Sequence, residues 1–162
     1  MATTTRLFHC PPEAVFGVLA DGWTYPVWVV GATRMRRVDE NWPQPGSRIE
    51  HSVGVWPAVL DDETVVVEWD APRRALLHAK GWPIGEARVL VEVRPHAEGC
   101  VVRLHEWAVK GPFQFMPKAL FDPPVHLRNR EALRRLAYLA EGQWETHETD
   151  ERSEPEERGE SA

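Results

Sequence analysis

The most regular hydrophobic pattern in the sequence lies toward its C-terminal end, where apolar residues recur at steps of three and four over residues 122–142. This period predicts an amphipathic helix. Asp122 is suited to cap the first free N–H groups, the two prolines that follow fit a first turn, and Gly142 is typical of a helix end. The face expected to be buried contains Val125, Asn129, Ala132, Leu133, Leu136, Ala137 and Ala140. Its alanines fill little volume, so this face is expected to form one wall of a cavity.

Between residues 32 and 110 the pattern changes to the apolar–polar alternation of β-strands. Strands are expected at residues 33–40, 47–56, 63–70, 75–82, 86–94 and 101–109, after a first strand at 3–9. The predicted inward faces are Ile49, His51, Val53 and Val55; Val65, Val67 and Trp69; Ala87, Val89, Val91 and Val93; and Val102, Leu104, Glu106 and Ala108. For residues 75–82 two inward faces remain open, either Leu77 with Ala79 or Leu76 with His78, Lys80 and Trp82.

Two short helical segments are expected after the first strand. Pro11, Pro12 and Glu13 favour a helix start before residues 14–20, and the aromatic residues around Pro26 indicate a second short segment. The hairpin-length connections between later strands predict an antiparallel meander. The fold class is therefore α+β, a curved antiparallel sheet of six to seven strands wrapped around the long C-terminal helix.

The net charge of −6 for 162 residues comes from the C-terminal segment. Residues 145–162 contain eight acidic and two basic residues, so the rest of the chain is neutral. A neutral body does not favour a nucleic-acid partner. The acidic segment lacks the apolar residues needed to fold, so residues 1–142 are predicted to form one domain and 143–162 a disordered tail. That tail serves solubility or contacts a protein partner.

The two cysteines, Cys10 and Cys100, do not form the dense pattern of a disulfide-rich secreted domain and are expected to be free thiols. The N-terminal residues lack the apolar stretch of a secretory signal. The longest segment without a charged residue covers residues 22–33, too short for the ~20 apolar residues of a membrane helix. A cytoplasmic location without an integral membrane segment is expected.

Four stretches resemble the START-like or helix-grip superfamily, also described as SRPBCC or polyketide cyclase/dehydrase-like proteins. They are PPEAVFGVLADGWTYPVWV at residues 11–29, PGSRIEHSVGVWP at 45–57, VRLHEWAVKGP at 102–112 and RNREALRRLAYLAEG at 128–142. Members of this superfamily are known as lipid and steroid carriers, polyketide cyclases, hormone receptors and chaperone-like co-factors. The resemblance implies a hydrophobic cavity between sheet and helix that is open at one end to a small apolar ligand.

Polar residues on otherwise apolar faces are the candidates for chemistry, namely His51, Glu106 and Asn129, with His78 as a weaker fourth. A buried carboxylate is costly unless it is hydrogen-bonded or meets water, so Glu106 is the most informative. One interpretation is a structural or ligand-orienting network. The other is catalysis, in which Glu106 and His51 exchange protons, the pKa of the carboxylate being raised by desolvation, and Asn129 orients a carbonyl. The predicted ligand-binding residues are His51, Val53, Trp56, His78, Trp82, Glu106, Asn129 and Leu133.

The connection at residues 110–121 is unusually apolar for a loop. Phe113, Phe115 and Met116 therefore either form a lid over the cavity or plug the end of the sheet. The tryptophans at 56 and 82 either line a pocket or fill the core. The arginines of the helix, at positions 128, 130, 134 and 135, are expected to form a solvent-exposed face around Glu131.

The sequence contains no phosphate-binding loop, nucleophile elbow, HExxH or CxxC motif, so neither a cofactor nor a metal is expected. Three functions follow from these patterns. The leading hypothesis is a protein that binds a hydrophobic or aromatic, lipid- or polyketide-like molecule. The alternatives are a cofactor-free cyclase or dehydratase that uses Glu106 and His51, and a protein-interaction module.

Overall fold

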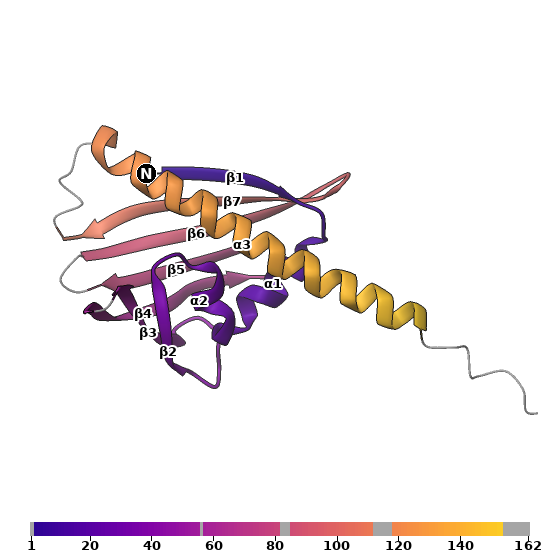
Figure 1. Cartoon of the computed structure of the whole chain (residues 1–162), viewed down its shortest axis with the longest axis horizontal. Helices are drawn as coiled ribbons and strands as arrows, with labels where there is room; N and C mark the ends of the chain where they lie inside the picture. The colour runs from indigo at the N-terminus through magenta and orange to yellow at the C-terminus, as the bar shows by residue number, and fades with distance from the viewer. Residues whose placement is uncertain (1, 56, 82–84, 112–117, 154–162) are drawn as a thin grey trace, which may run out of the picture.

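A computed structural model describes residues 2–55, 57–81, 85–111 and 118–153. One antiparallel sheet has the order β1-β7-β6-β5-β4-β3-β2 (Figure 1). Its strands are β1 (Ala2–Phe8), β2 (Ala32–Val38), β3 (Arg48–Val55), β4 (Ala58–Asp70), β5 (Arg74–Gly81), β6 (Gly85–His96) and β7 (Gly99–Lys110). The helical elements are α1 (Pro12–Ala20), a 3-10 turn η1 (Gly22–Thr24), α2 (Tyr25–Trp28) and α3 (Lys118–Ser153). The predicted fold is confirmed in its α+β class, in the meander of β2 to β7 that β1 completes to a seven-stranded sheet, and in the two short helices after β1.

The helices cover one face of the sheet, and the hydrophobic core lies between the two layers. α3 crosses this face and contacts β1, β7, α1 and α2 (Figure 1). Leu133 and Leu136 of α3 and Phe8 of β1 are completely buried in the core. α1 begins with Pro12 at its first position and contributes Val15 to the same cluster. The long helix is therefore anchored by leucines in its middle, as the sequence predicts.

The alternation of two strands is confirmed, while that of a third is wrong. On β3, Ile49 and His51 are buried, and on β7, Val102, Leu104 and Glu106 are buried. On β4 the predicted inward set was Val65, Val67 and Trp69. Instead Thr64 and Val66 are buried, Val67 is exposed, and Trp69 packs against the core. A register shift between Val66 and Glu68 inserts one residue, which reverses the alternation on one side of it.

The open question on β5 is settled by which residues line the pocket and which form ion pairs on the other face, since Leu76 is buried as well as Leu77. Ala75 and Leu77 are buried against the helical layer, and Ala79 lines a pocket on the same side. His78 and Lys80 lie on the opposite face, where each contacts an acidic residue of a neighbouring strand. Ala75 pairs with Val91 of β6 and Leu77 pairs with Val89, so these apolar residues of the two strands lie side by side on the same face of the sheet.

Both predicted ends of the long helix are wrong. α3 begins at Lys118 and includes Pro123 and Pro124 within its length, so the helix does not start at Asp122. Gly142 does not adopt the left-handed conformation of a helix end, and the helix continues through the acidic residues to Ser153. A glycine inside a helix costs about 1 kcal/mol relative to alanine. Trp144, two residues further on, packs against the core.

The last turns of α3 extend beyond the sheet (Figure 1). Residues 143–153 belong to α3, and residues 154–162 lie outside the described part of the chain. The division into a domain at 1–142 and a tail at 143–162 stays a prediction.

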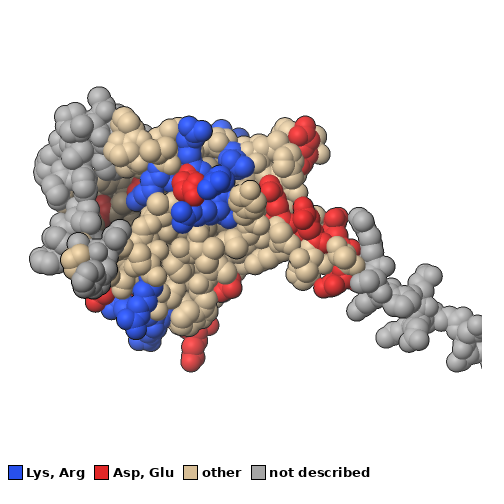
Figure 2. Space-filling view, viewed as in Figure 1, with Lys and Arg blue, Asp and Glu red and all other residues tan. Residues whose placement is uncertain are grey.

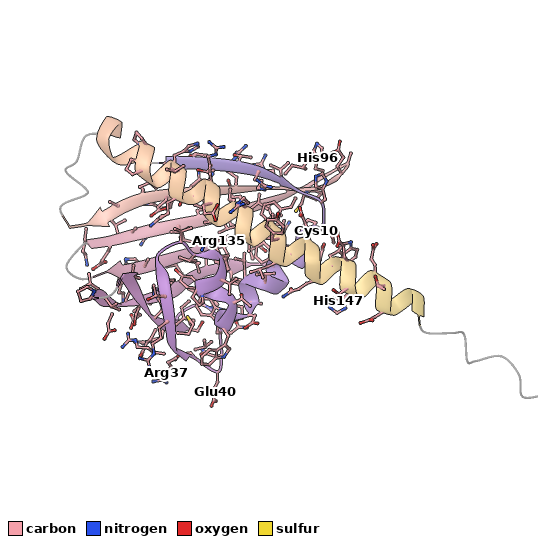
Figure 3. All side chains as sticks on the ribbon, viewed as in Figure 1. Cys10, Arg37, Glu40, His96, Arg135 and His147 are labelled. Carbon is pink, nitrogen blue, oxygen red and sulfur yellow. The ribbon has the colours of Figure 1, made fainter. Side chains whose placement is uncertain are left out.

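Cys10 and Cys100 are free thiols, as predicted, and both are buried. Cys10 follows β1 and lies beside α3 (Figure 3). Among the helices of the described segments, none is long and apolar enough to cross a membrane.

Candidate functional site

A pocket lies between α2, α3 and the inner face of the sheet. Its volume is about 410 Å³, which includes the part that is open to solvent. Its apolar lining consists of Trp28, Val29, Val30, Leu77, Ala79, Val89, Leu104 and Ala132. Its polar lining consists of Tyr25, Thr64, Glu106, Arg128 and Asn129. Because this volume includes the open mouth, the enclosed part of the pocket is much smaller.

One polar group of the pocket is centred on the Arg128 guanidinium. Its Nη2 donates to the Glu106 carboxylate Oε2 across the gap between α3 and β7. The same Nη2 lies 3.3 Å from the Asn129 Oδ1 and donates to it as well. The Glu106 side chain is 7% exposed and that of Arg128 43%, so the carboxylate is inside and the guanidinium reaches the mouth. The ion pair allows a carboxylate to be buried in an otherwise apolar wall.

The orientation of the Asn129 amide follows from this contact. Arginine has only donors, so the amide atom that faces it must be the oxygen. The Asn129 Nδ2 then points away from Arg128, and it is buried with no hydrogen-bond partner among the residues that the structure describes. Asn129 is 2% exposed and lines the pocket. The pocket therefore contains a buried donor whose acceptor is missing.

A second polar group joins three elements around the Thr64 hydroxyl. The Tyr25 hydroxyl lies 3.0 Å from Thr64 Oγ1, and the His51 Nε2 lies 3.1 Å from it. The rings of Tyr25 and His51 are stacked with their centres 4.8 Å apart. Burial raises the pKa of Tyr25 to about 12, so its hydroxyl keeps its proton at neutral pH.

Burial also lowers the pKa of His51 to about 4, and the positive charge of Arg36 acts in the same direction. His51 is therefore a neutral imidazole at neutral pH. Its Nδ1 is buried without a hydrogen-bond partner.

The structure brings two of the predicted site residues together and separates the others. Glu106 and Asn129 both line the pocket and share the guanidinium of Arg128. His51 does not line the pocket and contacts it through Tyr25 and Thr64. Val53 is half-buried outside the lining, and Leu133 is fully buried in the core. The three polar residues thus form two linked groups rather than one.

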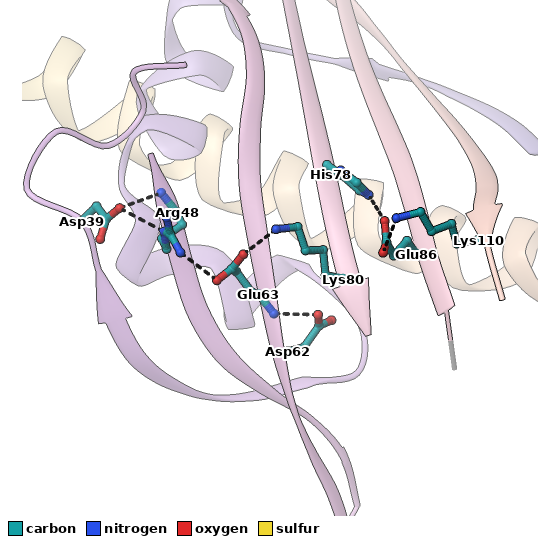
Figure 4. A network of polar contacts seen from close by, with 8 residues as sticks. All are labelled: Asp39, Arg48, Asp62, Glu63, His78, Lys80, Glu86 and Lys110. Carbon is teal, nitrogen blue, oxygen red and sulfur yellow. Dashed lines mark hydrogen bonds and ion pairs between the residues drawn. The ribbon is translucent and has the colours of Figure 1, made fainter. Parts of the chain in front are cut away.

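His78 lies on the other face of the sheet. Its Nε2 is 2.9 Å from Glu86 Oε2, and the same carboxylate contacts Lys110 (Figure 4). The pair of Lys80 and Glu63 lies nearby and belongs to a separate polar group that includes Arg48 (Figure 4). The expectation that His78 faces the ligand is therefore wrong, because the alternation of β5 directs its neighbours Leu77 and Ala79 to the pocket instead.

Several predicted site residues lie outside the residues that the structure describes. These are the tryptophans Trp56 and Trp82 and the proposed lid residues Phe113, Phe115 and Met116. Their roles stay predictions.

Sequence reasoning placed Arg128 on the solvent-exposed face of the helix, where it does lie, but missed its contact with Glu106. Arg134 and Arg135 lie on the same face, and both donate to Glu131, whose pKa they lower to about 2. Figure 2 shows basic side chains gathered around an acidic one on the helix. A signal for Arg128 was present, because a buried Glu106 requires a counter-charge and Arg128 is adjacent to Asn129.

The aromatic pair of α2 was also missed as part of the lining. Tyr25 and Trp28 pack edge to face, with ring centres 5.4 Å apart, and both line the pocket. The signal was their position in a short segment too small to bury them by itself. Among the described residues, no group of three histidine, cysteine or acidic side chains is arranged to hold a metal ion.

The family model described as "Polyketide cyclase / dehydrase and lipid transport" matches residues 2–141. The chain belongs to this family. The match covers every strand of the sheet and α3 up to the turn that precedes Gly142. Membership in this polyketide cyclase and lipid transport family is consistent with a pocket for a hydrophobic ligand, and it identifies no particular ligand.

Solved structures share the fold at low sequence identity. Protein CV1439 from Chromobacterium violaceum is 17% identical with a TM-score of 0.64, over 86% of this chain and 96% of that one. Protein SA2116 of unknown function from Staphylococcus aureus is 10% identical with a TM-score of 0.68, over 88% and 93%. Protein NE0264 from Nitrosomonas europaea is 15% identical with a TM-score of 0.68, over 87% and 94%. A search of curated protein sequences found no match.

Proposed function

We propose that this family member binds a small hydrophobic or aromatic molecule, lipid-like or polyketide-like in character, between the sheet and α3. The observation that supports this is the pocket itself. Most of its lining is aliphatic or aromatic, with a few polar side chains, three of which are joined around the Arg128 guanidinium. This combination is typical of small-molecule sites, where apolar walls provide affinity and a few polar groups fix orientation.

The helix face that borders the pocket is only partly open. Ala132 lines the pocket, whereas Ala137 and Ala140 are buried in the solid core with Leu133. Among the described residues, the part of α3 that borders the proposed ligand site runs from Arg128 to Ala132. A side chain larger than alanine at position 132 would occupy space that the ligand needs.

The geometry argues against the alternative of a cofactor-free cyclase that uses Glu106 and His51. His51 lies behind Tyr25 and Thr64, so it does not reach a molecule in the pocket. With a pKa of about 4 it is a neutral imidazole at neutral pH, so it is not the imidazolium that a general acid would require. The Glu106 carboxylate is engaged by Arg128. No observation favours the protein-interaction alternative, and the cytoplasmic location stays a prediction.

The experiment is a binding screen followed by a test of the site. Fatty acids, alkanones and flat aromatic compounds are titrated into isotope-labelled protein, and amide chemical shifts are followed by NMR. Contacts between bound ligand and the side chains of Leu77, Val89 and Leu104 should appear as nuclear Overhauser effects. Native mass spectrometry of protein purified from its own source tests for a ligand that is already bound.

Ala132→Leu is the variant that tests the location, because its larger side chain should fill the pocket and reduce affinity. Ala97→Leu is the matched control, since Ala97 is exposed between β6 and β7. Thermal melting checks that both variants fold. The proposal fails if no compound shifts the resonances of the pocket, or if a folded Ala132→Leu variant binds as the wild type does.

A further inference from the structure

The polar end of the pocket has a composition that selects among ligands. We propose that the pocket accepts hydrophobic molecules with a neutral hydrogen-bond acceptor, such as a ketone, and rejects carboxylates of the same shape. In this inference Asn129 provides the donor and Glu106 excludes the carboxylate. The inference rests on the proposed function, because it names the class of ligand for the same pocket.

Asn129 provides the first half of the argument. Its Oδ1 is held by Arg128 at 3.3 Å, and its Nδ2 is a buried donor without a partner beside the pocket. A buried donor that lacks an acceptor is costly, and a ligand oxygen that accepts from it removes this cost. An acceptor on the ligand therefore gains more at this position than an apolar group of equal size.

The charge of the site provides the second half. An arginine at the mouth of a pocket would by itself favour a carboxylate ligand. Here the Arg128 guanidinium is already paired with the Glu106 carboxylate, which is itself only 7% exposed. A carboxylate ligand would place a second negative charge beside Glu106 in a largely apolar space, and close like charges repel strongly there. A ketone oxygen meets the same donors without that repulsion.

Neighbouring groups do not reverse this preference. Tyr25 keeps its proton at neutral pH and is neutral, and so is His51 behind it. The remaining lining of the pocket is apolar apart from the Thr64 hydroxyl. Within the described residues, Arg128 and Glu106 are thus the two charged side chains of the lining, and their charges cancel.

Three ligands of nearly equal size separate these effects: acetophenone, benzoate and ethylbenzene. Affinities are measured by NMR titration at neutral pH. Acetophenone should bind about tenfold more tightly than benzoate. It should also bind about fivefold more tightly than ethylbenzene, which corresponds to one neutral hydrogen bond. The Asn129 side-chain amide resonance should shift with acetophenone and not with ethylbenzene.

Two variants assign the roles. Glu106→Gln keeps the shape and removes the charge, so benzoate should gain about tenfold in affinity while ethylbenzene is unchanged. Asn129→Leu removes the donor, so acetophenone should fall to the affinity of ethylbenzene. If either variant fails to fold, the comparison of the three ligands on wild-type protein still decides the selectivity.

The outcomes separate this inference from the proposed function. Binding of ethylbenzene that Ala132→Leu blocks, with benzoate as tight as acetophenone, overturns the inference and leaves the proposed function intact. Unchanged benzoate affinity in a folded Glu106→Gln variant also overturns it. If none of the three ligands binds, the inference is wrong, and an equally negative broader screen removes the proposed function too.

Discussion

His51 should make the stability of the protein depend on pH in a specific direction. The imidazole is 1% exposed, stacks on Tyr25 and contacts the Thr64 hydroxyl through Nε2. Burial and the positive charge of Arg36 lower its pKa from 6.5 to about 4. The folded protein therefore resists protonation of His51, while the unfolded chain does not.

The sign and size follow from linkage. Above pH 6.5 His51 is neutral in both states and adds nothing to the pH dependence. Between pH 6.5 and about 4 the unfolded chain binds the proton and the folded protein does not, so the free energy of unfolding falls as the pH falls. At about 1.4 kcal/mol per unit of pKa difference, the full loss is about 3 kcal/mol. Below the folded pKa the loss stops growing.

The assay is urea unfolding, followed by circular dichroism, at several pH values between 7.5 and 4.5. The comparison is wild type against His51→Gln, which cannot titrate and retains an amide near Thr64. Relative to the variant, wild type should lose about 2 to 3 kcal/mol over this range. His96→Gln, at an exposed position, controls for the loss of an imidazole.

Burial raises the pKa of Asp62, so its contribution to the free energy of unfolding rises as the pH falls, opposite to that of His51. Asp62 is present in both proteins, so its contribution cancels when the free energy of unfolding of His51→Gln is subtracted from that of the wild type. If the free energies of unfolding of wild type and His51→Gln differ by the same amount at every pH between 7.5 and 4.5, the assignment of His51 as a buried neutral imidazole is refuted. NMR titration of the His51 ring protons gives the same pKa independently.

Further variants test other parts of the structure by urea unfolding. Arg128→Met should lower the free energy of unfolding by about 2 kcal/mol, less than for a fully buried pair because the guanidinium is 43% exposed. Adding Glu106→Gln should recover part of this loss. If the losses of the two single variants simply add in the double variant, the ion pair is contradicted. Gly99→Ala should cost at least about 2 kcal/mol, because Gly99 has a φ of +134° and an added Cβ would meet the β1 backbone. Gly46→Ala is its control, with a φ of +88° and open space, and an equal loss in both would exclude the clash as the cause. Trp144→Ala should lower the free energy of unfolding by about 1 to 2 kcal/mol and reduce the helix content. If neither changes, the packing of Trp144 against the core does not stabilise the C-terminal end of α3.

The sequence predicted most elements of the fold because their patterns are local. The alternation on β3 and β7 and the helical period of α3 are properties of neighbouring residues, and each follows from which side chains avoid water. The bulge on β4 escaped prediction, because nothing in its sequence distinguishes an inserted residue from a regular strand. The C-terminal end of α3 was also mispredicted. Gly142 favours a helix end locally, whereas the helix continues past it to Trp144, which packs against the core.

The candidate site divides in the same way. Burial of Glu106, Asn129 and His51 on apolar faces could be predicted from alternation and helical period alone. The sequence could not predict which of these three residues contact one another, because the contacts depend on how α3 lies across the sheet. His51 and Glu106 belong to strands at different positions in the sheet, with β4, β5 and β6 between them.

By itself the sequence determined the α+β class, the antiparallel meander, the inward faces of β3 and β7 and the burial of His51, Glu106 and Asn129. These follow from periods of two and 3.6 residues, which the covalent chain imposes. Only the tertiary structure decided that Arg128 turns inward to Glu106, that His51 lies behind Tyr25, and that the Asn129 Nδ2 is left without an acceptor. The physical reason is that burial of a charge or amide is settled by partners far away in sequence, and 22 positions separate Arg128 from Glu106.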